Sequence, residues 1–262
     1  MALSQKQIDL VEDTIINSIR NRFKTYNPEP ASMPFHTRLL GKDRLALYSF
    51  IHSLNTNFGT TIFEPVAAKI ATIRFKVVEF QKKSGKQISE YAQYKIQKIM
   101  DELTTANRKP DKQKEIEIIR KVCQKGQKRA VNPTRVDIYL ESDEGEVYLF
   151  DIKTAKPNKG GFKEFKRTLL EWSATVLSEN PKASVNTLIA IPYNPYEPKP
   201  YSRWTMAGML DLDKELKVGE EFWDFLGGRG AYEDLLGCFE RVGIKMRQEI
   251  DTYFAKFNSY HK

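Results

Sequence analysis

Residues 132–161 constrain the fold more than any other part of the chain, because they have the pattern of a β-hairpin. From residue 135 to residue 140, β-branched and aromatic residues alternate with polar ones, as in a strand that buries one face. Residues 142–145 are turn formers, and residues 146–152 return as a second strand. The chain is therefore predicted to contain a sheet built on this hairpin.

Two acidic residues and one lysine of this hairpin are candidates for catalysis. Asp137 lies on the first strand, and Asp151 and Lys153 lie at the end of the second. Opposed residues of a hairpin are about 5 Å apart, so the two carboxylates repel each other unless a cation lies between them. Mg²⁺ suits such a pair, because it takes one or two carboxylates together with water and phosphate oxygens. Lys153 shares a strand face with Asp151, where it can hold an attacking water beside the metal.

The order of these residues resembles the PD-(D/E)XK nuclease core, the catalytic centre of most type II restriction endonucleases. Residues 132–137 match the first half of the motif, although the proline does not directly precede Asp137, and residues 151–153 match the second half. The resemblance implies that Asp137 and Asp151 bind Mg²⁺, helped by a carbonyl after Asp151, and that Lys153 orients the water. It also implies a restriction-endonuclease-like α/β fold with a mixed central β-sheet flanked by α-helices.

Glu64 is the candidate for a further metal ligand. In many nucleases of this superfamily an acid on a helix before the hairpin completes the metal site. Glu64 directly precedes Pro65, where the sequence predicts that a helix begins and continues to about Phe80. The alternative is that Glu64 only stabilises the start of this helix through the helix dipole.

A narrower resemblance, to the TdeIII family of type II restriction endonucleases that cut GGNCC-like sites, rests on residues 35–44, residues 53–67 and the hairpin. It implies a homodimer on a palindromic site in double-stranded DNA, in which each subunit cuts one strand. It further implies a prokaryotic, cytoplasmic restriction-modification system with a cognate DNA methyltransferase that is not a stable subunit of the nuclease.

The charge distribution favours an acidic partner such as DNA. The chain carries a net charge of +8 and has a pI near 9.2. Nine basic and three acidic residues lie at positions 107–129, and six basic and one acidic residue lie at positions 153–167. These segments flank the proposed acidic centre in sequence, as expected if phosphates are drawn over a metal site.

Individual DNA contacts are predicted from three loops. They are a basic loop at residues 35–44, the glycine-containing loop after the hairpin, and a proline- and aromatic-rich loop at residues 192–204. The candidate side chains are Arg38, Lys42, Arg44, Lys156, Lys159, Lys199 and Arg203. A solvated basic surface and a proline-stiffened surface loop are the alternatives.

The composition excludes several other classes of protein. Cys123 and Cys238 are two lone thiols, and with three histidines they form no zinc-ligand spacing. No apolar run approaches the length of a membrane span, the N-terminus lacks the order of a signal peptide, and there is no Walker-type phosphate loop. With no linker long enough to separate domains, residues 1–262 are predicted to form a single endonuclease domain.

Three alternatives to a restriction enzyme stay open at this point. The same nuclease core occurs in repair and recombination nucleases, which recognise DNA structure in place of sequence. A DNA-binding protein without catalysis would use the acids structurally. The hairpin can also be a surface element with a cross-strand ion pair between an aspartate and a lysine, worth under about 1 kcal/mol.

Overall fold

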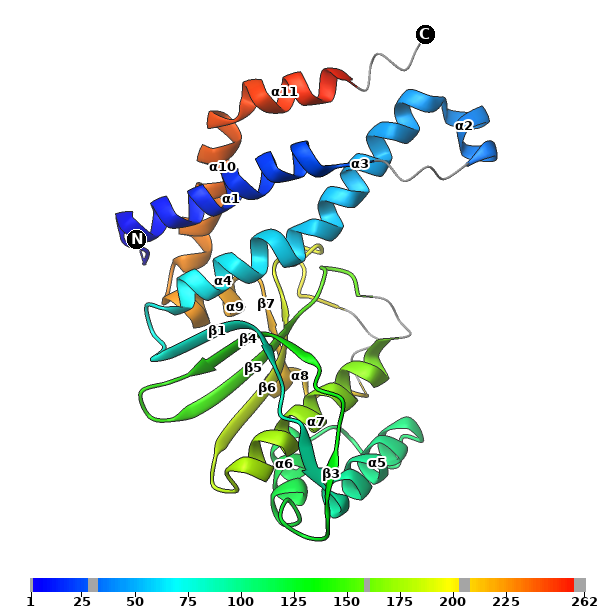
Figure 1. Cartoon of the computed structure of the whole chain (residues 1–262), viewed down its shortest axis with the longest axis vertical. Coiled ribbons are helices and arrows are strands. Elements are labelled where there is room, and N and C mark those ends of the chain that lie inside the picture. Colours follow the sequence, from blue (N-terminus) through cyan, green and yellow to red (C-terminus); the bar gives the residue numbers. More distant parts are fainter. Residues whose placement is uncertain (1, 28–32, 158–160, 203–207, 257–262) are drawn as a thin grey trace.

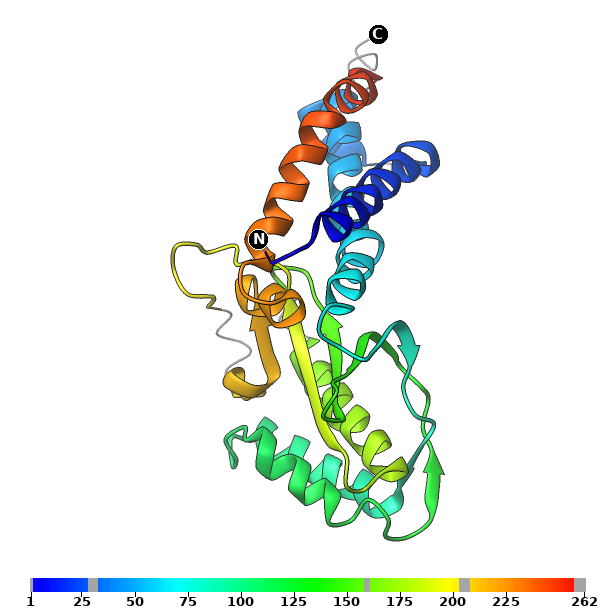
Figure 2. The same ribbon diagram turned by 90° about the vertical axis from the view of Figure 1, so that its left-hand side faces the viewer.

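A computed structural model describes residues 2–27, 33–157, 161–202 and 208–256 of the chain. Figures 1 and 2 show a central sheet with a group of helices rising from one end, and two shorter helices at the opposite end. None of the described helices is both long enough and apolar enough to cross a membrane.

The centre of the fold is a five-stranded mixed sheet with the order β1-β4-β5-β6-β7 (Figure 1). Its strands are β1 (Val77–Lys83), β4 (Arg135–Glu141), β5 (Glu146–Ile152), β6 (Ser184–Ile191) and β7 (Leu216–Val218). The first two pairings are antiparallel and the last two are parallel. The predicted α/β class with a mixed central sheet is confirmed.

The predicted hairpin forms as β4 and β5. Its turn is closed by a hydrogen bond from the backbone N–H of Gly145 to the carbonyl of Ser142. Gly145 has a φ of +79°, which a residue with a side chain adopts only with strain. From β5 the chain crosses through helix α7 (Phe162–Glu179) to the parallel strand β6.

Helices cover both faces of the sheet and form two separate cores. On one face, α5 (Glu90–Thr104), α6 (Lys112–Arg120) and α7 pack over apolar residues such as Leu149 and Ile189. On the other, α1 (Gln5–Thr25), α4 (Glu64–Ala71), α9 (Glu220–Gly227) and α10 (Ala231–Lys245) pack over residues such as Ile138 and Phe150. The remaining short elements are β2 (Gln87–Ser89), β3 (Lys128–Ala130) and α8 (Leu212–Glu215).

A helical arm extends beyond the sheet, and its longest element leads back to it (Figure 1). After α2 (Pro34–Leu40), helix α3 (Lys42–Phe58) runs through a π-helical segment, η1 (Gly59–Phe63), directly into α4. Phe50 of α3 stacks with aromatic rings of α1 and of α11 (Arg247–Ala255) in a small third core. The arm is therefore tied to both ends of the chain.

The prediction of a helix from Pro65 to about Phe80 is wrong at both ends. The helix is already formed before Pro65, because α3 continues through η1 into α4. Pro65 is tolerated there because the wider turns of η1 already interrupt the regular hydrogen-bond ladder that a proline breaks. It ends at Ala71, and residues Val77–Lys83 form strand β1 because they pair with β4. Near the C-terminus, α10 and α11 are two separate helices divided at Met246.

A fully buried cluster of charges joins α6, α7 and α8 beneath one face of the sheet. The Nζ atom of Lys166, which is 0% exposed, lies 2.5 Å from Glu115 and 2.6 Å from Glu215. The Nζ atom of Lys112 lies 3.0 Å from Glu215 and donates to the hydroxyl of Thr187 at 2.5 Å. Each buried charge thus has a partner of opposite sign, which a buried ion needs to be tolerated.

Replacing Lys166 with methionine should strongly destabilise the fold. The variant keeps the volume but leaves Glu115 and Glu215 buried with one cation fewer, and loss of one partner of a buried ion pair costs about 3–5 kcal/mol. Urea unfolding followed by circular dichroism measures the change. Lys163→Met, at an exposed position of the same helix, is the matched control, and equal unfolding midpoints for the two variants would show that the cluster contributes nothing.

Candidate active site

The hairpin register brings Asp137 and Asp151 together. Ile138 of β4 pairs with Phe150 of β5. Asp137 directly precedes Ile138 and Asp151 directly follows Phe150, so in this antiparallel pair the two acids lie at the same end of the ladder. The Oδ2 atom of Asp137 accepts a hydrogen bond of 2.8 Å from the backbone N–H of Ile152. Both acids are nearly inaccessible, with exposed fractions of 5% and 8%. The structure therefore creates a buried carboxylate pair where the sequence predicted one.

Lys153 is held beside this pair by three contacts. Its Nζ atom lies 2.7 Å from Oδ1 of Asp151 and 4.6 Å from the centre of the Phe165 ring. Its backbone N–H donates to the carbonyl of Ala190 on β6. A cation between a carboxylate and an aromatic face is restricted in its rotamers, so the position of the ammonium group is well defined.

Glu64 joins the same site from α4 and is 2% exposed. Its carboxylate accepts hydrogen bonds from Nη2 of Arg135 at 3.2 Å and from Nε2 of Gln81 at 3.0 Å. Arg135 also donates through Nε to Oδ1 of Asp137 at 3.2 Å. Arg135 therefore bridges the acid of the helix and the acid of the hairpin.

Arg135 and Gln81 are site residues that sequence reasoning missed. Arg135 precedes Asp137 by two positions on the same strand, and this spacing was a usable signal because alternate residues share a face. Gln81 gave no such signal, because it follows a segment that the sequence predicted to be helical. Its φ of +55° is rare for a residue with a side chain and marks a distorted position in the edge strand.

Burial and like charges raise the pKa of Asp137 to about 7. The largest cause is the loss of water around its carboxylate, followed by repulsion from Asp151 and then from Glu64. The hydrogen bond from Ile152 and the charge of Arg135 act in the opposite direction. The site thus holds more negative charge than its own cations compensate.

This donor set fits a divalent cation. Asp137 and Asp151 offer hard carboxylate oxygens, and Mg²⁺ needs only one or two of these because water and phosphate supply the rest. Within the described ranges, no three His, Cys, Asp or Glu side chains are grouped as a ready-made metal site. Glu64 is paired with Arg135 and Gln81 instead, so its role as a ligand stays a prediction.

The acids and Lys153 line a cleft of about 1370 Å³. One wall comes from the segment between His52 and Glu64, and the others come from the end of the hairpin, the start of α7 and the loop at Pro192. Lys156 also lines the cleft, with its Nζ atom 5.7 Å from the ring of Tyr196. The cleft is open to solvent, so a large substrate can approach it.

The other predicted DNA contacts lie farther out. Lys199 is exposed on the loop after β6, and Arg38, Lys42 and Arg44 are exposed on α2 and at the start of α3. Lys159 and Arg203 lie outside the described residues. Among the residues that line the cleft, none comes from the basic segment at positions 107–129, so its closeness to the acids in sequence does not carry over to this cleft.

Comparison with known proteins decides the class of the chain. Residues 3–243 match the sequence profile of the type II restriction endonuclease family HinfI. The chain belongs to the HinfI family. Its mixed α/β architecture is consistent with a restriction-endonuclease-like fold. Membership of this family identifies the protein as a site-specific deoxyribonuclease. The restriction-enzyme interpretation is therefore favoured over that of a DNA-binding protein without catalysis.

Curated relatives agree with the HinfI assignment. The chain is 27% identical over 257 residues to the type II restriction enzyme MjaII of Methanocaldococcus jannaschii, covering 87% of this chain and 68% of that enzyme. It is 27% identical over 225 residues to HgiCII and 25% identical over 225 residues to HgiEI, both type II restriction enzymes of Herpetosiphon aurantiacus. These two alignments cover 83% of this chain and 80% and 79% of the relatives. The predicted restriction endonuclease is confirmed, whereas the narrower TdeIII resemblance is not.

Asp137→Asn should stabilise the metal-free protein at pH 8 and have little effect near pH 4. Because the pKa of Asp137 is raised from 3.8 to about 7, the native state keeps a proton that the unfolded state has released. The contribution of this group to the free energy of unfolding therefore falls as the pH rises from 3.8 to about 7. Asparagine removes the charge and can still accept from Ile152. Thermal unfolding in a chelator at both pH values measures the difference.

Asp143→Asn in the exposed hairpin turn serves as the control for this experiment. It removes one negative charge from the same hairpin without changing the buried site. An Asp137→Asn variant no more stable than the wild type at pH 8 would contradict the unfavourable burial of this carboxylate.

Proposed function

We propose that the protein hydrolyses phosphodiester bonds of double-stranded DNA with Mg²⁺ held by Asp137 and Asp151. The observation that carries this proposal is the buried carboxylate pair with Lys153 beside it in a large open cleft. A Mg²⁺ ion bound there supplies Lewis-acid polarisation of the scissile phosphate and stabilises the leaving oxygen. Membership of a family of DNA-cleaving enzymes supports the same function.

Each side chain of the site has a separate proposed role. Lys153 orients the attacking water through a hydrogen bond from its ammonium group, and Asp151 holds that group at 2.7 Å. Arg135 pairs with Glu64 and Asp137 and offsets part of their charge, and with Mg²⁺ bound to the acids it would be available to contact a phosphate. Glu64 would then help to hold the ion as a third acidic side chain.

DNA is proposed to enter the cleft with its backbone against basic side chains around the rim. Lys156 lines the cleft, Lys199 is exposed on the loop after β6, and Arg38, Lys42 and Arg44 are exposed farther out on the helical arm. Lys159 and Arg203 are retained as candidates from the sequence. Such contacts position the duplex, whereas base-edge contacts from the same loops would specify the site.

The biological unit is proposed to be a homodimer of one-domain subunits on a short palindromic site. A two-fold protein matches a two-fold sequence, and two active sites are needed to cut both strands. A GGNCC-type sequence is the specific candidate. A cognate methyltransferase would protect the host DNA, and both enzymes would act in the cytoplasm of a prokaryote, where that DNA lies.

Asp151→Asn should abolish site-specific cleavage. The purified protein is incubated with a plasmid of mixed sequence in Mg²⁺, and fragment ends are mapped. We expect discrete wild-type fragments with ends in one palindromic sequence, and a rate for Asp151→Asn or Lys153→Ala lower by roughly two to four orders of magnitude.

Asp143→Asn, at the exposed turn of the same hairpin, should cut like the wild type. Equal cutting by Asp151→Asn and the wild type would overturn the assignment of the site. Ends scattered over unrelated sequences, or found only at branched structures, would favour a repair or recombination nuclease. Ends in a palindrome other than GGNCC would reject only that specificity.

Glu64→Gln tests the third ligand. If Glu64 contributes to the metal site, the variant should need a higher Mg²⁺ concentration for half-maximal cleavage, by roughly tenfold for one lost ligand contact. Glutamine retains the size of the side chain and an oxygen that can accept from Arg135. An unchanged Mg²⁺ dependence with an unchanged maximal rate would limit Glu64 to its ion pair with Arg135.

A further inference from the structure

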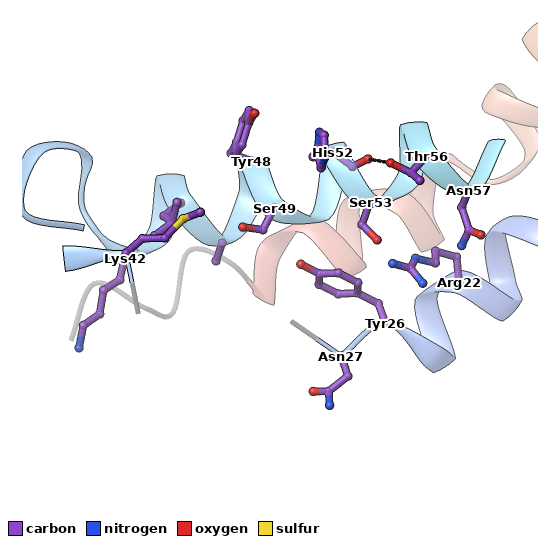
Figure 3. A pocket seen from close by; sticks show the side chains of 13 residues that line it. Arg22, Tyr26, Asn27, Lys42, Tyr48, Ser49, His52, Ser53, Thr56 and Asn57 are labelled. Carbon is purple, nitrogen blue, oxygen red and sulfur yellow. Dashed lines mark hydrogen bonds between the residues drawn. The ribbon is translucent and has the colours of Figure 1, made fainter. Parts of the chain in front are cut away.

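A second hollow of about 880 Å³ lies on the helical arm, between the start and middle of α3 and the end of α1 (Figure 3). Ser49, Ser53 and Asn57 project from α3 toward Arg22 and Tyr26 at the end of α1. The three α3 residues recur at intervals of four, which places them along one face of a helix. This hollow, here called the arm groove, takes no part in the proposed metal chemistry.

The arm groove is lined by hydrogen-bond donors and positive charge. Arg22, Lys42 and His52 contribute nitrogen donors, and the residues of the α3 row contribute hydroxyl and amide groups. None of the described residues that line the groove is acidic, in contrast to the cleft, whose walls include Asp137 and Asp151. Cations with Ser, Thr, Asn and Tyr donors are the usual partners of phosphate and sugar oxygens in protein–DNA contacts.

Arg22 provides an independent sign of a missing acceptor. Its Nε atom is buried and has no hydrogen-bond partner among the described residues, and its guanidinium lies 5.0 Å from the ring centre of Tyr26. A buried polar nitrogen without a partner is uncommon and costs free energy. A guanidinium can donate two parallel hydrogen bonds to the oxygens of a phosphate.

The arm groove and the cleft share two lining residues. His52 and Thr56 of α3 line both hollows, so α3 is a common wall that leads from the carboxylate pair outward along the arm. A duplex whose scissile phosphate lies in the cleft carries a phosphate every few ångströms along each strand, and its flanking backbone can continue along such a wall.

We infer that the arm groove binds the phosphate backbone of the DNA flanking the cleavage site, with Arg22 as its main contact and Ser49, Ser53 and Asn57 as supporting donors. This inference rests on the proposed function and extends it to a binding site away from the catalytic centre. The contact is independent of sequence, so it contributes affinity and orientation but no base specificity.

The test uses equilibrium binding of a long duplex of mixed sequence without divalent metal, so that no cleavage takes place. Fluorescence anisotropy is measured over a series of salt concentrations for the wild type, Arg22→Met, Arg22→Lys and Lys24→Met. Lys24 is the matched control, because it is an exposed cation on the same turn of α1 that does not line the groove. Thermal unfolding of each variant confirms that the fold is intact.

Arg22→Met should weaken binding by about three- to tenfold and reduce the slope of log K against log salt by about one, as expected for one lost phosphate contact. Arg22→Lys should restore the salt slope, since it retains the charge, and Lys24→Met should leave both quantities close to the wild type. Cleavage by Arg22→Met should show a raised KM with kcat little changed, because the arm lies outside the catalytic centre.

Equal effects of Arg22→Met and Lys24→Met would overturn the inference, as would an Arg22→Met variant with wild-type affinity. A shift of Arg22→Met to a smaller species in sedimentation, with an unchanged salt slope, would also overturn it and assign the groove to contacts between protein subunits. Wild-type protein that cuts DNA while the groove variants bind normally would reject the arm groove alone. Wild-type protein that neither binds nor cuts DNA would reject the proposed function as well.

Discussion

The pairing register of the β4–β5 hairpin is the constraint on which the site depends. Side chains alternate between the two faces of a strand, so a shift of one residue would turn Asp137 away from Asp151. The register is fixed from both sides, because apolar residues on either strand belong to the two cores and the turn at Gly145 sets the loop length. The repulsion between the two acids is therefore overcome by the burial of their neighbours.

The rest of the fold supplies what the hairpin lacks. Strand β6 binds the backbone of Lys153, and α7 contributes the ring of Phe165 against which its ammonium group lies. The continuous helix from α3 through η1 to α4 brings Glu64 to the acids and carries His52 along the wall of the cleft. The buried charges around Lys166 join α7 to α6 and α8 on the far face, which steadies the helix that begins at the cleft.

The grouped carboxylates of the site reduce the stability of the folded protein. The pKa of Asp137, raised to about 7, reports a carboxylate that is less favourable in the folded protein than in water. Arg135 offsets part of this repulsion through its bonds to Glu64 and Asp137. A bound cation would offset the remainder, so metal affinity and the pH dependence of stability have the same physical origin.

Local signals in the sequence, namely the alternation of apolar residues and the turn chemistry, were enough to predict the hairpin and the positions of Asp137, Asp151 and Lys153. The rest of the site could not be predicted from such signals. Residues 77–83 became the edge strand β1 through pairing with β4, against a helical prediction, and this pairing brought Gln81 to Glu64. The bridge made by Arg135 likewise depends on a contact between segments that are distant in sequence. Local patterns carry no information about such contacts, since they arise when the helices and the sheet bury their apolar faces against one another.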